Sequence, residues 1–207
     1  MISQIPLWSM GKSVGGPAFE ATIAGLSRRF RISLVQPAVE HVDASDVPAN
    51  VTLHPFEHRF HGLWREVPKL GWLTDTLAWY TFRWSAWSIV KSLCERGDVD
   101  LLYGYEIYGT PVARRAANRF GIPMVSRFQG TLMNDRQHMR FSRLRFHKHV
   151  AGLSVPADLV ILTNDGTCPP KYLTSLGHPA DRTRFWMNGV AKAILHTPFR
   201  AAPPALT

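Results

Sequence analysis

The chain has 207 residues, of which 45% are hydrophobic and 11% aromatic, and 24 lysines and arginines against 15 acidic residues give a formal charge of +9. This composition excludes a disordered chain, because it supplies enough apolar surface for a packed core. The positive charge favours an anionic partner, such as a sugar nucleotide, a phospholipid surface or nucleic acid, without choosing among them.

The cysteines and the N-terminus bear on the compartment. Cys94 and Cys168 are far apart and match no disulfide framework, so we expect a reducing environment. The first residues lack the basic and apolar regions of a signal peptide, and no apolar run approaches the roughly 20 residues that span a bilayer. We therefore expect a cytoplasmic protein, either soluble or peripheral on the inner face of the membrane.

Strand and helix patterns alternate along the chain. The expected elements are, in order, a strand over residues 2–7, a helix over 17–30, strands over 31–35 and 51–56, a long helix over 74–96, a strand over 100–105, a helix with Thr110 as N-cap, Pro111 at its first position and Gly121 after its last turn, and strands over 122–128, 159–163 and 184–187.

Apolar spacing predicts which helix faces are buried. Phe19, Ile23, Leu26 and Phe30 share one face of the first helix. In the long helix the core stripe is expected to comprise Phe82, Ala86, Ile89 and Leu93. Trp79, Trp84 and Trp87 fall off this stripe, which indicates a second apolar face.

Strands separated by helices predict parallel pairing with right-handed crossovers. The expected fold class is α/β, with a Rossmann-like, doubly wound and mostly parallel sheet of about seven strands and helices on both faces. Residues 1–190 form the predicted domain, and residues 191–207, which contain Ala-Pro-Pro, form a linker or tail.

The segment before the first helix has the composition of a phosphate-binding turn. Gly11-Lys12-Ser13 suggests a P-loop, but Pro6 occupies the position where that motif requires glycine. What remains is a Gly15-Gly16 turn ahead of a helix that begins at Pro17. Backbone N–H groups at such a helix start can hold an anion. An ordinary flexible turn is the alternative.

Two motifs suggest metal sites, and we expect a metal at neither. His54-Pro-Phe-Glu57-His58 matches the H-x-x-E-H pattern of inverted zinc proteases, which requires a helix, whereas Pro55 directly after a probable strand favours a loop. Asp98 and Asp100 resemble a paired-aspartate metal motif, but they precede an apolar strand. They are therefore expected to mark a helix-to-strand junction, away from the edge where open sheets bind ligands.

Residues 136–149 form a basic stretch interleaved with aromatic side chains. On a helix, Arg136, Arg140 and Arg143 would share one face. The stretch is either a solvated basic helix or a surface for anionic lipid or a phosphorylated substrate. Nucleic acid is not expected as a partner, because no aromatic pair occupies a recognisable RNA-binding motif.

In order along the chain, several segments resemble the N-terminal domain of family 4 retaining glycosyltransferases with the GT-B fold. They are Trp8-Ser-Met-Gly11-Lys with Gly15-Gly16-Pro17, Asp98-Val-Asp-Leu-Leu-Tyr-Gly, Phe120-Gly-Ile-Pro123-Met-Val-Ser-Arg-Phe-Gln129-Gly130-Thr, Ala157-Asp-Leu-Val-Ile-Leu-Thr163-Asn164-Asp-Gly166-Thr and Arg184-Phe-Trp-Met-Asn188-Gly189-Val190.

The resemblance implies one of two Rossmann-like domains that face each other across a cleft, with the acceptor on this domain and most of the nucleotide sugar on the other. Gly15 and Gly16 would approach the donor pyrophosphate, and Asn188 with Gly189 would form the hinge. The residues implied on the acceptor side of the cleft are Lys12, Tyr105, Glu106, Gln129, Gly130, Thr131 and Asn164.

The chain departs from the family pattern at three points. Many relatives carry histidine where this chain has Gln129, so we expect positioning from that residue and no acid–base role. Ala191 stands where an aspartate commonly follows Asn-Gly-Val. The family's glutamate pair is absent, which places the catalytic residues in a second domain. We accordingly expect a fragment, a truncated gene product or one subunit of a split enzyme.

The function implied is the acceptor-binding part of a glycosyltransferase that moves a sugar from a nucleotide sugar to a carbohydrate or lipid-linked acceptor, inactive alone. No cofactor and no obligatory metal are expected, and a separate C-terminal domain or subunit would be the protein partner. The alternative is a non-catalytic Rossmann-like module that binds an anionic ligand or membrane surface. In the complete enzyme, Gly16→Val is expected to harm donor use more than folding, because a β-branched side chain blocks close backbone approach.

Overall fold

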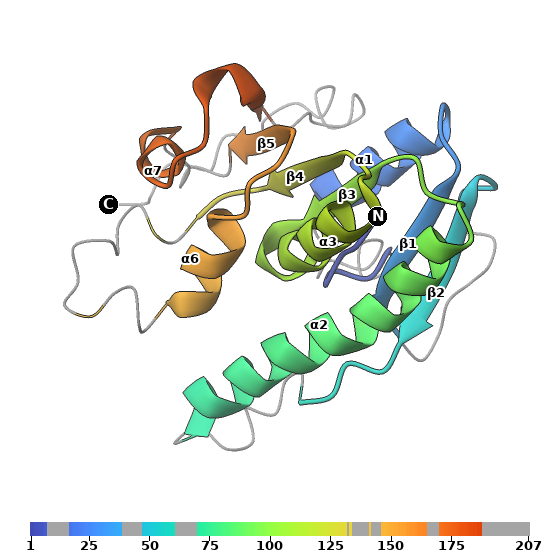
Figure 1. Ribbon diagram of the computed structural model, residues 1–207, viewed down its shortest axis with the longest axis horizontal. Helices are drawn as coiled ribbons and strands as arrows, with labels where there is room; N and C mark the ends of the chain where they lie inside the picture. The colour runs from blue at the N-terminus through green and yellow to red at the C-terminus, as the bar shows by residue number, and fades with distance from the viewer. Residues whose placement is uncertain are drawn as a thin grey trace, which may run out of the picture.

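The computed structural model describes residues 1–7, 17–38, 47–60, 70–131, 133, 141, 146–164 and 170–187. Helices and parallel strands alternate through these ranges (Figure 1). The helices are α1 (Pro17–Ser27), α2 (Gly71–Glu95), α3 (Glu106–Phe120), α6 (His147–Leu153) and α7 (Pro170–Ser175), with a 3-10 turn at Ala180–Arg182. The strands are β1 (Ile32–Pro37), β2 (Val51–Phe56), β3 (Leu102–Tyr105), β4 (Met124–Phe128), β5 (Leu159–Asn164) and β6 (Thr183–Met187).

All strand pairs are parallel, and one residue of the N-terminal segment joins them into a sheet. β1 pairs with β2, and β3 to β6 pair in chain order. Ile2 bridges Val35 of β1 on one side and Gly104 of β3 on the other. The resulting order is β2-β1-Ile2-β3-β4-β5-β6, so the direction in which strands are added reverses between Ile2 and β3. A crevice that binds ligands opens at the carboxyl ends of the strands at such a reversal.

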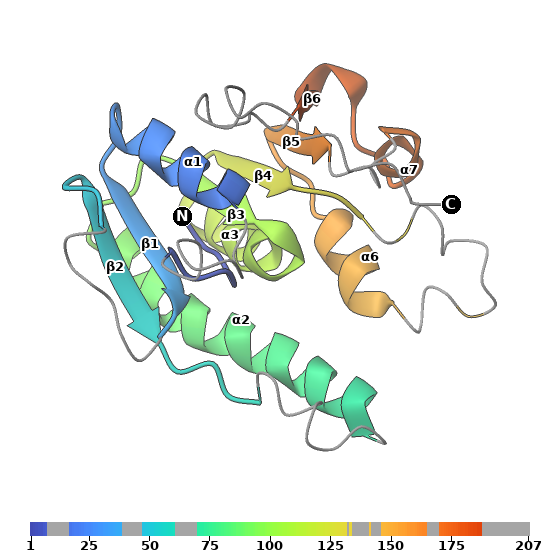
Figure 2. The same cartoon turned by 180° about the vertical axis from the view of Figure 1, so that it is seen from behind.

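The predicted fold class is confirmed, because helices cover both faces of the sheet (Figure 1 and Figure 2). On one face, Phe19 and Ile23 of α1 pack with Leu34 and Tyr105. On the other face, α2 and α3 enclose a larger core with the inward side chains of β3, β4 and β5. No described helix is long and apolar enough to cross a membrane.

Six strands and one bridge are observed among the described residues, where about seven strands were predicted. The expected strand over residues 2–7 shortens to the bridge at Ile2, because the next residues turn away from the sheet. The Ser3 hydroxyl accepts the N–H of Ile5 at 3.0 Å and donates to the Ile5 carbonyl at 2.9 Å. This turn directs Gln4 and Ile5 toward the carboxyl edge of the sheet, where they line a pocket.

The predicted start of α3 is wrong. The helix begins at Glu106, four residues before Thr110, and Pro111 lies inside it. A proline in the helix interior leaves the carbonyl four residues earlier without its partner. Here that carbonyl belongs to Ile107, and the indole N–H of Trp79 donates to it at 3.3 Å. Packing of α2 against α3 therefore supplies a hydrogen-bond donor for the Ile107 carbonyl, which Pro111 cannot supply. The predicted end is confirmed, since Gly121 follows the helix in the left-handed conformation at φ 70°.

The ends of the other two long helices also shift. α1 ends at Ser27, and the N–H groups of Arg29 and Phe30 both bond to the carbonyl of Leu26, so Phe30 is exposed. α2 begins at Gly71, three residues earlier than predicted. Its predicted core stripe is buried except for Ile89, which packs at the edge of the core.

The His54 to His58 motif begins within a strand, where the sequence favoured a loop, whereas Asp98 and Asp100 lie at the predicted helix-to-strand junction. His54 lies in β2 and His58 follows that strand, so the helix that H-x-x-E-H chemistry needs does not form. Asp98 lies between α2 and β3 and pairs with Arg96 at 2.9 Å, at the amino edge of the sheet. The described residues contain no group of three or more His, Cys, Asp or Glu side chains placed to hold a metal ion.

His54 is expected to make folding sensitive to acid. Burial, then the positive charges of the Met1 amino group and Arg96, lowers the pKa of His54 below its ordinary 6.5. The unfolded chain binds more protons at His54 between that lowered pKa and 6.5, so the His54 contribution to stability is complete above 6.5 and is lost as the pH drops through this window. Urea denaturation should show a His54 contribution of up to about 1.4 kcal/mol per pH unit, in addition to that of the Met1 amino group, whose pKa burial lowers from 8.0 to about 5. His54→Gln should reduce the slope by the His54 contribution, and an unchanged slope in the variant would contradict the assignment.

Candidate functional site

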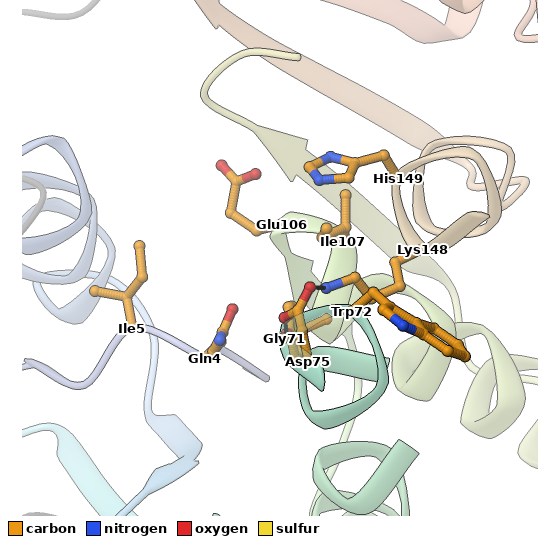
Figure 3. Close-up of a pocket in the computed structure, with 10 residues that line it drawn as sticks. Gln4, Ile5, Gly71, Trp72, Asp75, Glu106, Ile107, Lys148 and His149 are labelled. Carbon is orange, nitrogen blue, oxygen red and sulfur yellow. Dashed lines mark hydrogen bonds and ion pairs between the residues drawn. The ribbon is translucent and has the colours of Figure 1, made fainter. Parts of the chain in front are cut away.

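A pocket opens at the point where the strand order reverses. Its volume is about 580 Å³, within the range of small-molecule sites. Gln4 and Ile5 come from the segment after the Ile2 bridge, and residues 106–108 follow β3. The first turns of α2 and α6 supply the other walls (Figure 3). The complete lining is Gln4, Ile5, Gly71, Trp72, Asp75, Glu106, Ile107, Tyr108, Lys148 and His149.

Glu106 lines this pocket from a strained backbone position. Its φ of 58° places a side-chain-bearing residue in the left-handed region. That conformation costs about 1 kcal/mol or more, and such residues cluster at functional sites. The side-chain oxygen Oε1 accepts the backbone N–H of Gln129 at 2.6 Å. Glu106 therefore couples the end of β3 to the loop after β4, and Figure 3 shows its carboxylate on the side away from the Asp75–Lys148 pair.

Asp75, Lys148 and Tyr108 form a polar cluster that joins three helices. The ammonium of Lys148 pairs with the carboxylate of Asp75, and the Tyr108 hydroxyl lies 3.5 Å from the other carboxylate oxygen. The Lys148 side chain is only 11% exposed, whereas that of Asp75 is 44% exposed. Burial, then the Asp75 charge, raises the pKa of Tyr108, so its hydroxyl stays protonated and can donate.

Polar and apolar surfaces alternate around the pocket. Gln4, Glu106 and His149 offer hydrogen-bonding groups at its mouth, whereas Ile5 and Trp72 are apolar (Figure 3). Trp72 is 72% exposed, so its ring is available to a ligand that enters. A sugar presents hydroxyl groups on its rim and C–H groups on its faces. The lining therefore suits a small polyhydroxylated ligand.

The residues predicted for the acceptor side come together only in part. Glu106 lines the pocket, and Gln129, which does not line it, donates its backbone N–H to Glu106. Thr131 is buried and accepts the N–H of Met133 at 3.0 Å. Gly130 lies in the same loop, and Asn164 ends β5 at the same edge of the sheet. Tyr105 points to the opposite face, where its ring packs 4.5 Å from that of Phe19 and outside the pocket.

The remaining predicted site residues lie outside the described residues. They are Lys12, Gly15 and Gly16 of the glycine-rich turn, Asn188 and Gly189 of the hinge, and Arg136, Arg140 and Arg143 of the basic stretch. Their assignments stay predictions.

Several residues that line the pocket were not predicted from the sequence. Asp75 and Lys148 are 73 positions apart, and no local pattern pairs them. Lys148 and His149 fall in the basic stretch, so their charge was noted but not their position. The one usable signal was the predicted end of a strand at residue 105, because ligands of an α/β fold bind at the carboxyl ends of its strands.

Substitutions in the Asp75–Lys148 pair should have unequal effects. Asp75→Asn leaves the more buried partner, the Lys148 cation, without its counter-ion and should lower the free energy of unfolding by about 3 kcal/mol. Lys148→Met leaves a carboxylate that water can reach and should cost about 1 kcal/mol. Urea denaturation of both variants and of the double variant tests this. Equal losses, or a double variant that loses the sum of both, would contradict it.

The fold and the pocket define a class: a doubly wound α/β domain with a pocket at its strand-order reversal. No protein-family model matches the sequence, and no curated protein matches it. Solved structures do match. A crystal structure of Anabaena Alr3699/HepE with UDP and glucose is 16% identical and covers 91% of this chain, with a TM-score of 0.51. Another, with UDP, is 20% identical and covers 84% of this chain, with a TM-score of 0.48.

This likeness concerns the fold. The chain spans 43% of the length of Alr3699/HepE in the first of these structures and 41% in the second. The domain described here thus corresponds to less than half of that protein.

Proposed function

We propose that this chain is the acceptor-side part of a glycosyltransferase, which moves a sugar from a nucleotide sugar to a carbohydrate or lipid-linked acceptor. The observation that carries the proposal is the pocket at the strand-order reversal, in which Glu106, Gln4 and His149 surround a space of about 580 Å³ beside an exposed tryptophan. The resemblance of the motif series to family 4 enzymes and the fold shared with a protein that binds UDP and glucose support it.

Within this proposal, Glu106 orients an acceptor hydroxyl. A carboxylate accepts hydrogen bonds from hydroxyl groups. The Glu106 carboxylate also accepts the backbone N–H of Gln129, and this hydrogen bond fixes the orientation of the carboxylate. Gln129 acts as a positioning residue, since its backbone holds the carboxylate. The Asp75–Lys148 pair keeps the adjoining wall closed.

The donor would lie at the start of α1. Backbone N–H groups of Gly15 and Gly16 and the dipole of the helix that begins at Pro17 would stabilise charge on the leaving diphosphate, without an obligatory metal. Retention of configuration and the residues that perform the chemistry are assigned to a second domain or subunit. The chain alone should transfer sugar poorly, because donor contacts and closure of the cleft need that second part.

Ligand titration followed by NMR tests the proposal on this chain. Glucose, UDP and inorganic phosphate are added separately, and shifts are recorded for the indole N–H of Trp72 and the backbone of Glu106 and His149. We expect glucose to shift these signals in the millimolar range, the usual strength for a ligand this small. Shifts with phosphate and UDP but none with glucose would favour the alternative, a module for anionic ligands. Robust sugar transfer by the chain alone would contradict the need for a second part.

A further inference from the structure

The N-terminal half of α2, with Leu70 directly before it, carries an apolar face that points away from the core. Five large apolar side chains on it are exposed, among them Tyr80 at 54% and Trp84 at 81%. We call this set the α2 stripe; it comprises Leu70, Leu73, Leu77, Tyr80 and Trp84. Figure 1 and Figure 2 both show this part of α2 along the outer edge of the domain.

The spacing of the α2 stripe makes it one continuous surface. Its members follow at intervals of three, four, three and four residues. At 100° per residue they fall within a sector of about 80°, opposite the sector of Phe82 and Ala86, which are fully buried. Toward the C-terminus the same sector becomes polar, with the exposed Lys91–Glu95 ion pair. The α2 stripe is therefore about 21 Å long and ends within the helix.

The charge of the chain and the composition of the α2 stripe indicate which partner covers the stripe. A second copy would bring the same +9 charge to the contact and would be repelled. An anionic surface would be attracted. Tyrosine and tryptophan favour the boundary between water and lipid, where their apolar rings and polar tips are both satisfied. Arg83 borders the stripe, its guanidinium 4.4 Å from the centre of the Trp79 ring and 5.8 Å from that of Tyr80. We propose that the α2 stripe docks on the surface of an anionic lipid bilayer.

The position of the stripe relative to the pocket gives the docking a consequence. Trp72, the second residue of α2, lines the pocket and is exposed beside the first residues of the stripe. A bilayer on the stripe would therefore lie next to the mouth of the pocket, with the headgroups within reach. This consequence rests on the proposed function and favours a lipid-linked acceptor over a free carbohydrate. The docking itself does not depend on the pocket binding anything.

Vesicle flotation of the complete chain tests the docking. Vesicles of phosphatidylcholine alone are compared with vesicles of equal parts phosphatidylcholine and phosphatidylglycerol, at low and high salt. The test variant is Leu77→Ser with Trp84→Ser, two exposed side chains of the stripe outside the pocket. The matched control is Phe185→Ser with Trp186→Ser, two exposed side chains on β6. Circular dichroism verifies that both variants are folded.

We expect the wild type and the control to bind the phosphatidylglycerol vesicles, and salt to weaken that binding. The stripe variant should bind at least about tenfold more weakly, because its apolar side chains no longer enter the boundary. Binding to neither vesicle, equal binding by the stripe variant, or equal loss in the control would overturn the proposal. Dimers in sedimentation velocity that the stripe variant abolishes, without vesicle binding, would overturn it in favour of self-association.

A third variant separates the α2 stripe from the basic stretch, for which the sequence also predicts membrane contact. Arg136→Ser, Arg140→Ser and Arg143→Ser are combined. About 1 kcal/mol for each arginine would give a loss of roughly a hundredfold if that stretch binds the bilayer alone. With the stripe as the docking surface, the combined variant should retain binding that the stripe substitutions then remove. Complete loss in the arginine variant would overturn the assignment to α2.

Discussion

Gly109→Ala is expected to lower the free energy of unfolding by about 3 kcal/mol. A Cβ atom at Gly109 would lie 2.2 Å from the carbonyl oxygen of Ile2, a backbone atom that cannot move as a side-chain end would. The same oxygen accepts the N–H of Tyr105 at 2.9 Å, within the bridge that joins the two halves of the sheet. Relief of the clash would therefore separate α3 from the sheet or break that bridge.

Gly25→Ala is the matched control for this prediction. Gly25 also lies within a helix, but an added Cβ meets no atom within 4 Å. Helix propensity alone should then act, and the variant should be more stable by up to about 1 kcal/mol. Urea denaturation of both variants measures the two effects. Equal stability of Gly109→Ala and the wild type would show that Ile2 is not held against α3.

Glu106→Gly is expected to weaken glucose binding at least about tenfold while leaving folding stability within about 1 kcal/mol of the wild type. Two effects on stability oppose each other. Glycine adopts a φ of 58° without the penalty of a side chain, whereas loss of the carboxylate removes the acceptor of the Gln129 N–H. Binding has no such compensation, because the pocket loses one of its two carboxylates and the other, Asp75, is paired with Lys148.

Two further variants separate the contributions of Glu106. Glu106→Gln retains an acceptor oxygen for Gln129 but no charge, so its glucose affinity should lie between those of the wild type and Glu106→Gly. Glu95→Gln removes a carboxylate that pairs with Lys91 on the exposed side of α2 and should not change binding. The measurement is the NMR titration described for the pocket. If Glu106→Gly binds glucose as the wild type does, Glu106 serves only to hold the loop after β4.

The fold class could be predicted from the sequence because it depends on local periodicity. Val51–Phe56 is a strand at both bounds predicted, and Gly121 ends α3 as predicted. Both follow from the chemistry of a few neighbouring residues: a short run with apolar Val51, Leu53 and Phe56, and a glycine that tolerates positive φ. The alternation of such elements was sufficient to predict a doubly wound sheet.

The start of α3 could not be predicted in the same way. Local rules place Pro111 at the beginning of a helix, because its missing N–H then costs nothing. The observed helix begins at Glu106, since Trp79 of α2 supplies a donor for the Ile107 carbonyl. A residue 28 positions away thus decides the boundary. Helix propensities describe residues one at a time, so they cannot account for a hydrogen-bond donor from another helix.

For the candidate site, the family resemblance carried by the sequence named Glu106, which lines the pocket, and Gln129, whose backbone N–H donates to Glu106. The sequence could not show that Tyr105, next to Glu106, faces the opposite way, because alternation along a strand fixes the two faces but not which of them the pocket occupies. Only the tertiary structure brings Asp75 and Lys148 together with the end of β3. Such pairs depend on how whole helices pack, and the positions of those helices are set by the entire core, not by the residues that line the pocket.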